Sequence, residues 1–98
     1  MTFYKDPEQN ETKQFQKFAD VTDKRVLEIG CGEGRLTWRY ASASLSTVGV
    51  DADKDTVRVA AYDRPADLAD KVHFASAQAE YLPFHKETFD IAILAWSL

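Results

Sequence analysis

The feature that most constrains this chain is a glycine-rich segment directly after a short apolar run. Residues 25–29 have the composition of a buried strand, and Gly30, Gly32 and Gly34 fall within the next five positions. Glycine permits a tight turn and leaves bare backbone against which a ligand can lie. Amide groups at the start of a following helix favour a negative group on that ligand. The segment therefore predicts a strand–loop–helix unit with a binding site at the loop.

The spacing of these glycines separates the known classes of nucleotide-binding loop. The dinucleotide pattern Gly-x-Gly-x-x-Gly requires a third glycine at position 35, where this chain has Arg35. The phosphate loop of nucleoside triphosphatases requires Gly-Lys followed by Ser or Thr, and that sequence does not occur here. A nicotinamide-dependent oxidoreductase is therefore the least favoured of the functions considered.

Apolar runs and helical spacings alternate along the rest of the chain. The strands are uniformly apolar, as expected when helices cover both faces of a parallel sheet. This order predicts an α/β fold, a Rossmann-like parallel sheet with flanking helices and a ligand site at the carboxyl ends of the strands. Strands are expected over 25–29, 47–50, 72–75 and 89–95; a helix is expected with Leu36, Tyr40 and Ala43 on one face, a second capped by Asp53, and a separate turn opened by Pro65 and running through Leu68.

The N-terminal part differs from this alternating pattern. Residues 1–20 are interpreted as an arm followed by an amphipathic helix, with Pro7 in its first turn and Phe15 and Phe18 on one apolar stripe. This helix is expected to pack on the sheet edge, and a lid over the ligand is the alternative. Residues 21–98 form the predicted binding unit.

Asp51 closes the second predicted strand, 21 positions after Gly30. A carboxylate at that place can accept hydrogen bonds from both hydroxyls of a ribose, each worth about 1.5–3 kcal/mol when charge-assisted. A helix-capping or solvated aspartate is the alternative. Beside the glycine loop, ribose binding is the favoured interpretation.

Four segments together resemble the successive motifs of class I S-adenosylmethionine-dependent methyltransferases, in the branch that acts on small molecules. They are Val26–Thr37, Val48–Asp51, Ala79–Phe84, which contains Leu-Pro-Phe, and Phe89–Leu94. The resemblance covers residues 25–98. It implies a sheet that is truncated after the fourth strand, in the order 3-2-1-4, with an open apolar edge on that strand. A longer protein or a neighbouring chain in an oligomer is then expected to cover this edge.

The resemblance also implies S-adenosylmethionine as the cofactor and a role for each matching position. Glu28, Gly30 and Gly32 would border the methionine amino and carboxylate groups, and Asp51 would hold the ribose. Gln78 replaces the aspartate that usually contacts the adenine amino group in this family. The full candidate set for the cofactor is Glu28, Gly30, Cys31, Gly32, Gly34, Asp51, Ala52, Gln78, Ala79, Glu80, Leu94 and Ala95.

Other reactive residue types have more ordinary interpretations. Cys31 is interpreted as a small residue that fits the loop rather than as a nucleophile, and Glu80 as a support for its own loop. His73 is expected to be a packed or edge histidine, and His85 a surface one. Trp96 has two open interpretations, a cation–π contact to the sulfonium or core packing.

The predicted function is methyl transfer from S-adenosylmethionine to a small-molecule acceptor, with this chain supplying the cofactor-binding half. The acceptor site and any general base normally follow the fourth strand in this family. No catalytic residue is therefore named, and the fragment alone is expected to be inactive. A non-catalytic cofactor-binding or partner module is the alternative function.

Composition and charge argue against several other classes of protein. The net charge of −4 and the scattered basic residues argue against nucleic-acid binding. No apolar run approaches the roughly 20 residues that span a bilayer, and the N-terminus does not resemble a signal peptide, so a cytoplasmic location is expected. Cys31 is the single cysteine, and no Cys/His cluster has the spacing of a metal site.

Overall fold

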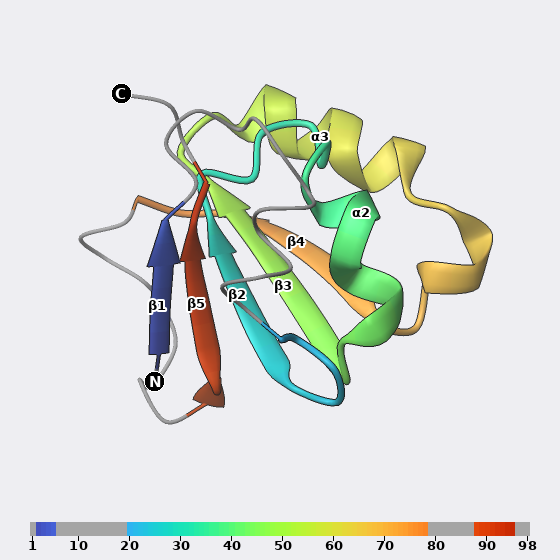
Figure 1. Ribbon diagram of the computed structural model, residues 1–98. Coiled ribbons are helices and arrows are strands. Elements are labelled where there is room, and N and C mark those ends of the chain that lie inside the picture. The colour runs from blue at the N-terminus through green and yellow to red at the C-terminus, as the bar shows by residue number, and fades with distance from the viewer. Residues whose placement is uncertain (1, 6–19, 79–87, 96–98) are drawn as a thin grey trace.

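The computed structural model describes residues 2–5, 20–78 and 88–95, which form a five-stranded parallel sheet (Figure 1). The strand order is β1-β5-β2-β3-β4, and the carboxyl ends of the strands therefore meet at one edge of the sheet. In chain order the elements are β1 (Thr2–Lys5), β2 (Arg25–Ile29), α2 (Thr37–Tyr40), the 3-10 turn η1 (Ala41–Ala43), β3 (Ser46–Asp51), α3 (Lys54–Asp63), the 3-10 turn η2 (Ala66–Leu68), β4 (Val72–Ser76) and β5 (Ile91–Leu94).

The predicted α/β class and the order 3-2-1-4 are confirmed by β4, β3, β2 and β5. The first three predicted strands match the observed ones to within one residue at each end. The fourth was predicted over 89–95 and is shorter, because β5 covers only Ile91–Leu94. Phe89 precedes the strand and is buried against the sheet as a loop residue.

The expected open edge on β5 is not present, and this prediction was wrong. Residues Thr2–Lys5 of the N-terminal arm form β1, which pairs with β5 in parallel, with Thr2 opposite Ile91 and Lys5 opposite Leu94. The pairing satisfies backbone groups that an edge strand leaves unpaired. The helix predicted in the arm lies almost entirely outside the described residues and stays a prediction.

The helix predicted after the glycine loop is shorter than expected. One α-helical turn, α2, passes into the 3-10 turn η1 at Ala41. The Ser44 hydroxyl donates a hydrogen bond of 2.7 Å to the Ala41 carbonyl, which is a local alternative to continued α-helix. Asp53 does cap α3, because its Oδ1 accepts from the amides of Asp55 and Thr56 at 2.9 and 3.2 Å. The turn after Pro65 is present as η2.

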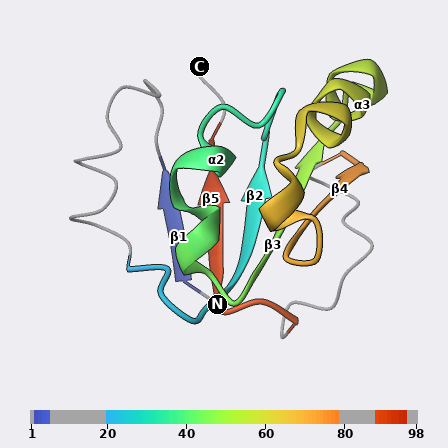
Figure 2. The ribbon, with the colours of Figure 1, turned by 90° about the vertical axis from the view of Figure 1, so that its right-hand side faces the viewer.

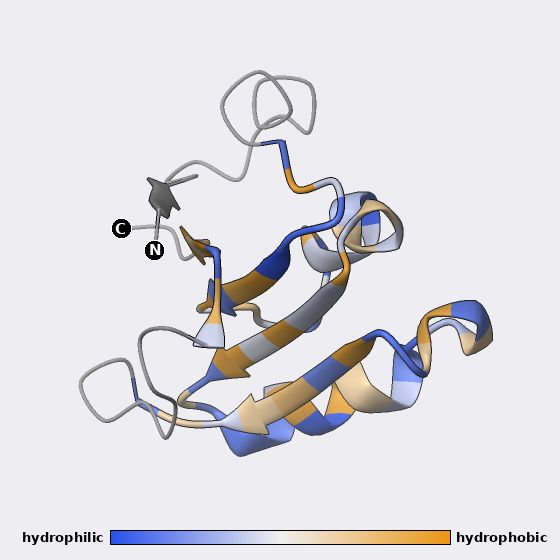
Figure 3. Ribbon diagram, turned by 90° about the horizontal axis from the view of Figure 1, so that it is seen from below, coloured by the Kyte–Doolittle hydropathy of each residue, from blue (hydrophilic) through white to orange (hydrophobic). Residues whose placement is uncertain are grey.

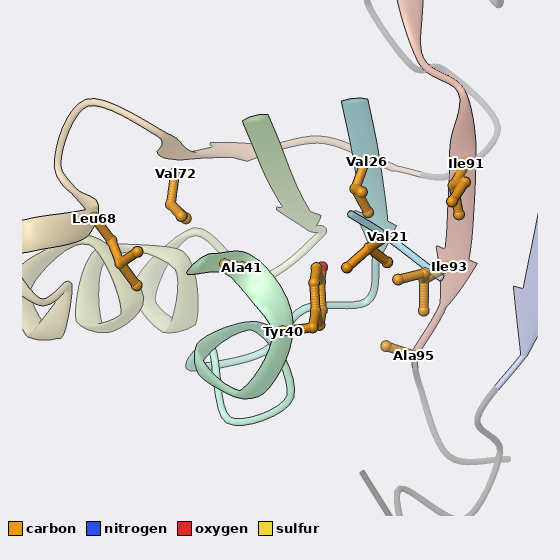
Figure 4. Packing of buried hydrophobic residues seen from close by; sticks show 9 residues of the cluster. All are labelled: Val21, Val26, Tyr40, Ala41, Leu68, Val72, Ile91, Ile93 and Ala95. Carbon is orange, nitrogen blue, oxygen red and sulfur yellow. The ribbon is translucent and has the colours of Figure 1, made fainter. Parts of the chain in front are cut away.

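Side chains of successive strand residues point to opposite faces of the sheet, and each face has its own apolar cluster. Figure 2 shows α2 in front of one face, and Figure 4 shows Tyr40 reaching from α2 toward Val21 and Ile93 on that side. Figure 3 shows apolar colours concentrated on the strands and mixed colours along the helices. The other face carries the cluster Leu27, Ile29, Val50 and Phe89.

No helix within the described ranges has both the length and the apolar character needed to cross a membrane.

An ion pair joins the start of β2 to the residue before β5. The Arg25 guanidinium donates to both carboxylate oxygens of Asp90, from Nε to Oδ2 at 3.1 Å and from Nη2 to Oδ1 at 3.0 Å. The Arg25 amide donates to the same carboxylate, and the Asp90 amide donates to the Arg25 carbonyl at 2.8 Å. These contacts place β5 in register beside β2.

The Arg25–Asp90 pair predicts how the stability of the fold depends on pH. The hydrogen bonds from the Arg25 side chain and amide hold the pKa of Asp90 well below its usual range. A carboxylate with a lowered pKa stabilises the fold above its unfolded pKa of about 3.9, and this stabilisation is lost as the pH falls toward the folded value. In urea denaturation, the stability gap between wild type and Asp90→Asn should be constant above about pH 5 and narrow below about pH 4. A gap of the same size at every pH would contradict the assigned role of the carboxylate charge.

Candidate functional site at the carboxyl edge of the sheet

The glycine loop between β2 and α2 is fixed to the end of β3 by backbone hydrogen bonds. The amides of Gly30 and Cys31 both donate to the Val50 carbonyl, at 2.8 and 3.0 Å. The Gly34 amide then donates back to the Cys31 carbonyl at 3.1 Å, which closes a tight turn. The loop is thus held at the carboxyl edge, where the sequence placed the ligand site.

All three loop glycines have positive φ angles, +80° for Gly30, +58° for Gly32 and +91° for Gly34. At Gly34 a Cβ atom would lie 2.6 Å from the indole ring of Trp38, so the ring occupies the place of a side chain. At Gly32 a Cβ atom would meet no atom of the described residues within 4 Å. Gly32 therefore presents bare backbone to open space, which is the property required for a ligand to approach closely.

The Asp51 carboxylate links the two loops at this edge. Its Oδ2 accepts from the Gly32 amide and its Oδ1 from the Asp53 amide, both at 3.0 Å. An ionised carboxylate offers about four acceptor positions, and the described residues occupy two of them. Asp51 is half-buried and is held in one orientation beside the open backbone of Gly32.

Glu28 lies inside the molecule rather than at the surface of the site. Its side chain is fully buried, and its Oε1 accepts hydrogen bonds from the Thr37 hydroxyl at 2.8 Å and the Tyr40 hydroxyl at 2.6 Å. Strand alternation explains this direction, because Glu28 shares the α2-facing side of β2 with Val26. The predicted contact between Glu28 and the methionine end of a cofactor stays a prediction.

Cys31 is buried within the loop. Burial, followed by the charges of Glu28 and Asp51, raises the pKa of its thiol far above the ordinary value. A thiol of this kind is not ionised at neutral pH and is a poor nucleophile, in agreement with its interpretation as a loop-fitting residue. A Cβ atom added at Gly49 would lie only 3.0 Å from the Cβ of Cys31, so the absence of a side chain at residue 49 makes room for the loop.

The other predicted site residues lie partly at the same edge. Ala52 and Gln78 are exposed, and the Ala77 amide donates to the Asp51 carbonyl at 3.0 Å, which brings the end of β4 beside Asp51. Leu94 pairs with Ile29 in the sheet, and the Ala95 amide donates to the Ile29 carbonyl at 2.8 Å. Ala79 and Glu80 lie outside the described residues, as do His85 and Trp96. His73 is exposed on the edge strand β4.

Four residues that shape the loop were not among the predicted site residues. Thr37 and Tyr40 bind Glu28, and Trp38 covers Gly34. Trp38 also meets Phe74 of β4 edge to face, with ring centroids 5.5 Å apart. The available signal was the spacing of Thr37 and Tyr40, three apart on one face of a helix and close to a buried acidic residue.

The sequence model of a protein family described as "methyltransferase domain" matches residues 26–98 of this chain. Among curated proteins, the chain is 36% identical over 69 residues to the uncharacterized methyltransferase YcgJ of Bacillus subtilis. It is 38% identical over 69 residues to the ubiquinone biosynthesis O-methyltransferase of Rhizobium rhizogenes. Each match covers 70% of this chain and 27% of the relative, so the chain spans about a quarter of the length of these proteins.

Solved structures show the same fold. The crystal structure of YcgJ superposes with a TM-score of 0.74 and 33% identity, over 82% of this chain and 35% of that one. An RNA methyltransferase from Salinibacter ruber, solved in complex with S-adenosyl-L-homocysteine, superposes with a TM-score of 0.70 and 25% identity, over 84% of this chain and 54% of that one.

The sheet order and the glycine loop beside an acidic strand end define a Rossmann-like methyltransferase fold. The chain belongs to the class I S-adenosylmethionine-dependent methyltransferase domain family, and it is a partial domain of that family.

The two glycines with different surroundings give a matched pair of variants. Gly32→Ala places its methyl group in open space and should cost only the strain of a positive φ, about 1 kcal/mol of unfolding free energy. Gly34→Ala adds a clash with Trp38 and should cost about 2–4 kcal/mol. Urea denaturation of both variants measures the difference. Equal losses would show that Trp38 does not pack on Gly34 as described.

Proposed function

We propose that this chain supplies the S-adenosylmethionine-binding half of an enzyme that transfers a methyl group to a small-molecule acceptor. The observation that carries the proposal is the pairing of the Asp51 carboxylate with the Gly32 amide, where bare backbone faces open space. Family membership supports the same cofactor class.

The residues at this edge fit an adenosyl cofactor. Within the described part of the chain, Asp51 binds the amides of Gly32 and Asp53, which leaves two acceptor positions for the ribose hydroxyls. Gly32 lets the methionyl end approach the backbone, since no atom of residues 20–78 or 88–95 lies within 4 Å of the place of its Cβ. Ala52 and Gln78, both exposed, would flank the adenine, and the backbone at Leu94 and Ala95 would border the methionyl end.

The cofactor carries the chemistry of the proposed reaction, because its sulfonium is an activated methyl donor. The task of this chain is to hold and orient that donor so that an acceptor can align with the methyl carbon. The acceptor class is proposed from the ubiquinone biosynthesis relative, whose name describes methylation in the synthesis of a small molecule. Since this chain spans 27% of that relative, we expect the acceptor site and any general base to be supplied by other residues.

Asp51→Ala tests the proposed site. The change removes both ribose acceptors and the anchor of the Gly32 amide, and one charge-assisted hydrogen bond is worth about 1.5–3 kcal/mol. Affinity for S-adenosylmethionine, measured by calorimetry, should therefore fall by tens-fold or more.

Asp63→Asn is the matched control, since Asp63 is exposed at the last residue of α3 and its replacement also removes one negative charge. This variant should bind like wild type. Unchanged affinity in Asp51→Ala would remove Asp51 from the site. Saturable cofactor binding without turnover, in this chain and in any longer form that contains it, would favour a non-catalytic binding module.

A further inference from the structure

The buried Glu28 carboxylate ties the strand before the glycine loop to the helical turn after it. Its Oε1 binds Thr37 and Tyr40, which are the first and last residues of α2. The Tyr40 contact of 2.6 Å is in the range of a charge-assisted hydrogen bond between a hydroxyl and a carboxylate. Burial, followed by the proximity of Glu28, raises the pKa of Tyr40 well above its ordinary value, so its hydroxyl remains a donor.

The helical turn whose side chains donate these bonds cannot be stable through its own backbone. α2 has four residues, and Leu36 at its start provides no side-chain cap. Isolated helices much longer than one turn are marginal in water, so α2 must be held by contacts with the rest of the fold. Two of its four side chains bind one buried oxygen, which fixes both the position and the rotation of the turn.

The place of this contact makes it relevant to the binding loop. Residues 30–36 leave β2 directly after Glu28 and Ile29, and they enter α2 at Thr37. The Trp38 amide donates to the Gly34 carbonyl at 3.0 Å. A shift of α2 would therefore move the backbone of the loop at Gly34. The Glu28 contact therefore sets the distance between the two ends of the loop that presents Gly32.

We propose that Glu28, Thr37 and Tyr40 form a positioning unit that holds the glycine loop in its cofactor-binding conformation. This inference rests on the proposed function, and it assigns Glu28 an action through α2 instead of a contact with the ligand. A loop that is already ordered binds without the cost of ordering, so loss of the unit should appear as weaker binding.

Three substitutions test the unit by calorimetry with S-adenosylhomocysteine, at a temperature where each variant is folded. Tyr40→Phe and Thr37→Val each remove one hydroxyl donor, and each should weaken binding by about tenfold. Thr37→Ser keeps the donor and should bind within about twofold of wild type, because its hydroxyl can restore the bond. Tyr62→Phe is the control for the tyrosine, since Tyr62 is 88% exposed on α3.

A double-mutant cycle separates action through α2 from direct contact. If Glu28 acts through Tyr40, the losses in Glu28→Gln and Tyr40→Phe should not add in the double variant. Additive losses would overturn the inference and favour a direct contact between Glu28 and the ligand. Weaker binding in Glu28→Gln with wild-type binding in Tyr40→Phe would have the same meaning. Lower stability with unchanged affinity in both hydroxyl variants would also overturn it, because that result indicates a purely structural role. If Glu28→Gln does not fold, the comparison of Thr37→Val with Thr37→Ser decides whether the hydroxyl bonds to Glu28 support binding.

Hydrogen exchange keeps this test independent of the proposed function. In the ligand-free chain, the amides of Gly32, Gly34 and Trp38 should exchange faster in Tyr40→Phe than in wild type. Unchanged exchange at these amides would overturn the positioning role. Failure of wild type to bind S-adenosylhomocysteine, together with faster exchange in the variant, would instead contradict the proposed function alone.

Discussion

The hydrogen bond between the Asp51 carboxylate and the Gly32 amide is the contact on which the site depends. It joins the end of β3 to Gly32 in the loop after β2, where an added Cβ atom would meet no described atom within 4 Å. The bond exists because both strands are parallel neighbours in the sheet, with Ile29 opposite Val50. Parallel pairing brings both carboxyl ends to one edge, and the amides of Gly30 and Cys31 extend that pairing into the loop by binding the Val50 carbonyl. The hydrogen bonds that pair β2 with β3 therefore continue without a break into the loop of the candidate site.

A second layer lies beneath this edge and stabilises it from the inside. Small residues make room for the loop, since Gly49 leaves space for Cys31 and Gly34 leaves space for Trp38. Trp38 reaches Phe74 on β4, so the packing extends from α2 across to the strand beside β3. Glu28 adds a buried polar anchor on the same face. Such a group is costly to bury unless hydroxyl or amide donors surround it, and Thr37 and Tyr40 supply two.

Local signals in the sequence were sufficient to predict the central strands and the position of the glycine loop at their carboxyl ends. The apolar runs gave β2, β3 and β4, and Asp53 and Pro65 marked a helix start and a turn because their effects are local. The strand β1 could not be predicted in this way, since pairing between Thr2 and Ile91 joins residues far apart in the chain. The length of α2 was also missed, because the hydroxyl of Ser44 competes with the helical backbone.

The same distinction applies to the site. Glycine conformation and an acidic strand end are properties of single positions, so the sequence pointed to Gly32 and Asp51. The α2 turn covers one face of β2, and the surroundings of the Glu28 side chain depend on which face this is. The family motif does not specify the covered face. Strand alternation with Val26 was the signal that predicts an inward direction.

A crystal structure of this chain with S-adenosylhomocysteine tests the central claim most directly. The account predicts that the ribose hydroxyls bind the Asp51 carboxylate and that the homocysteine part lies against the backbone at Gly32. A ligand bound elsewhere, or a ribose that does not contact Asp51, would contradict it.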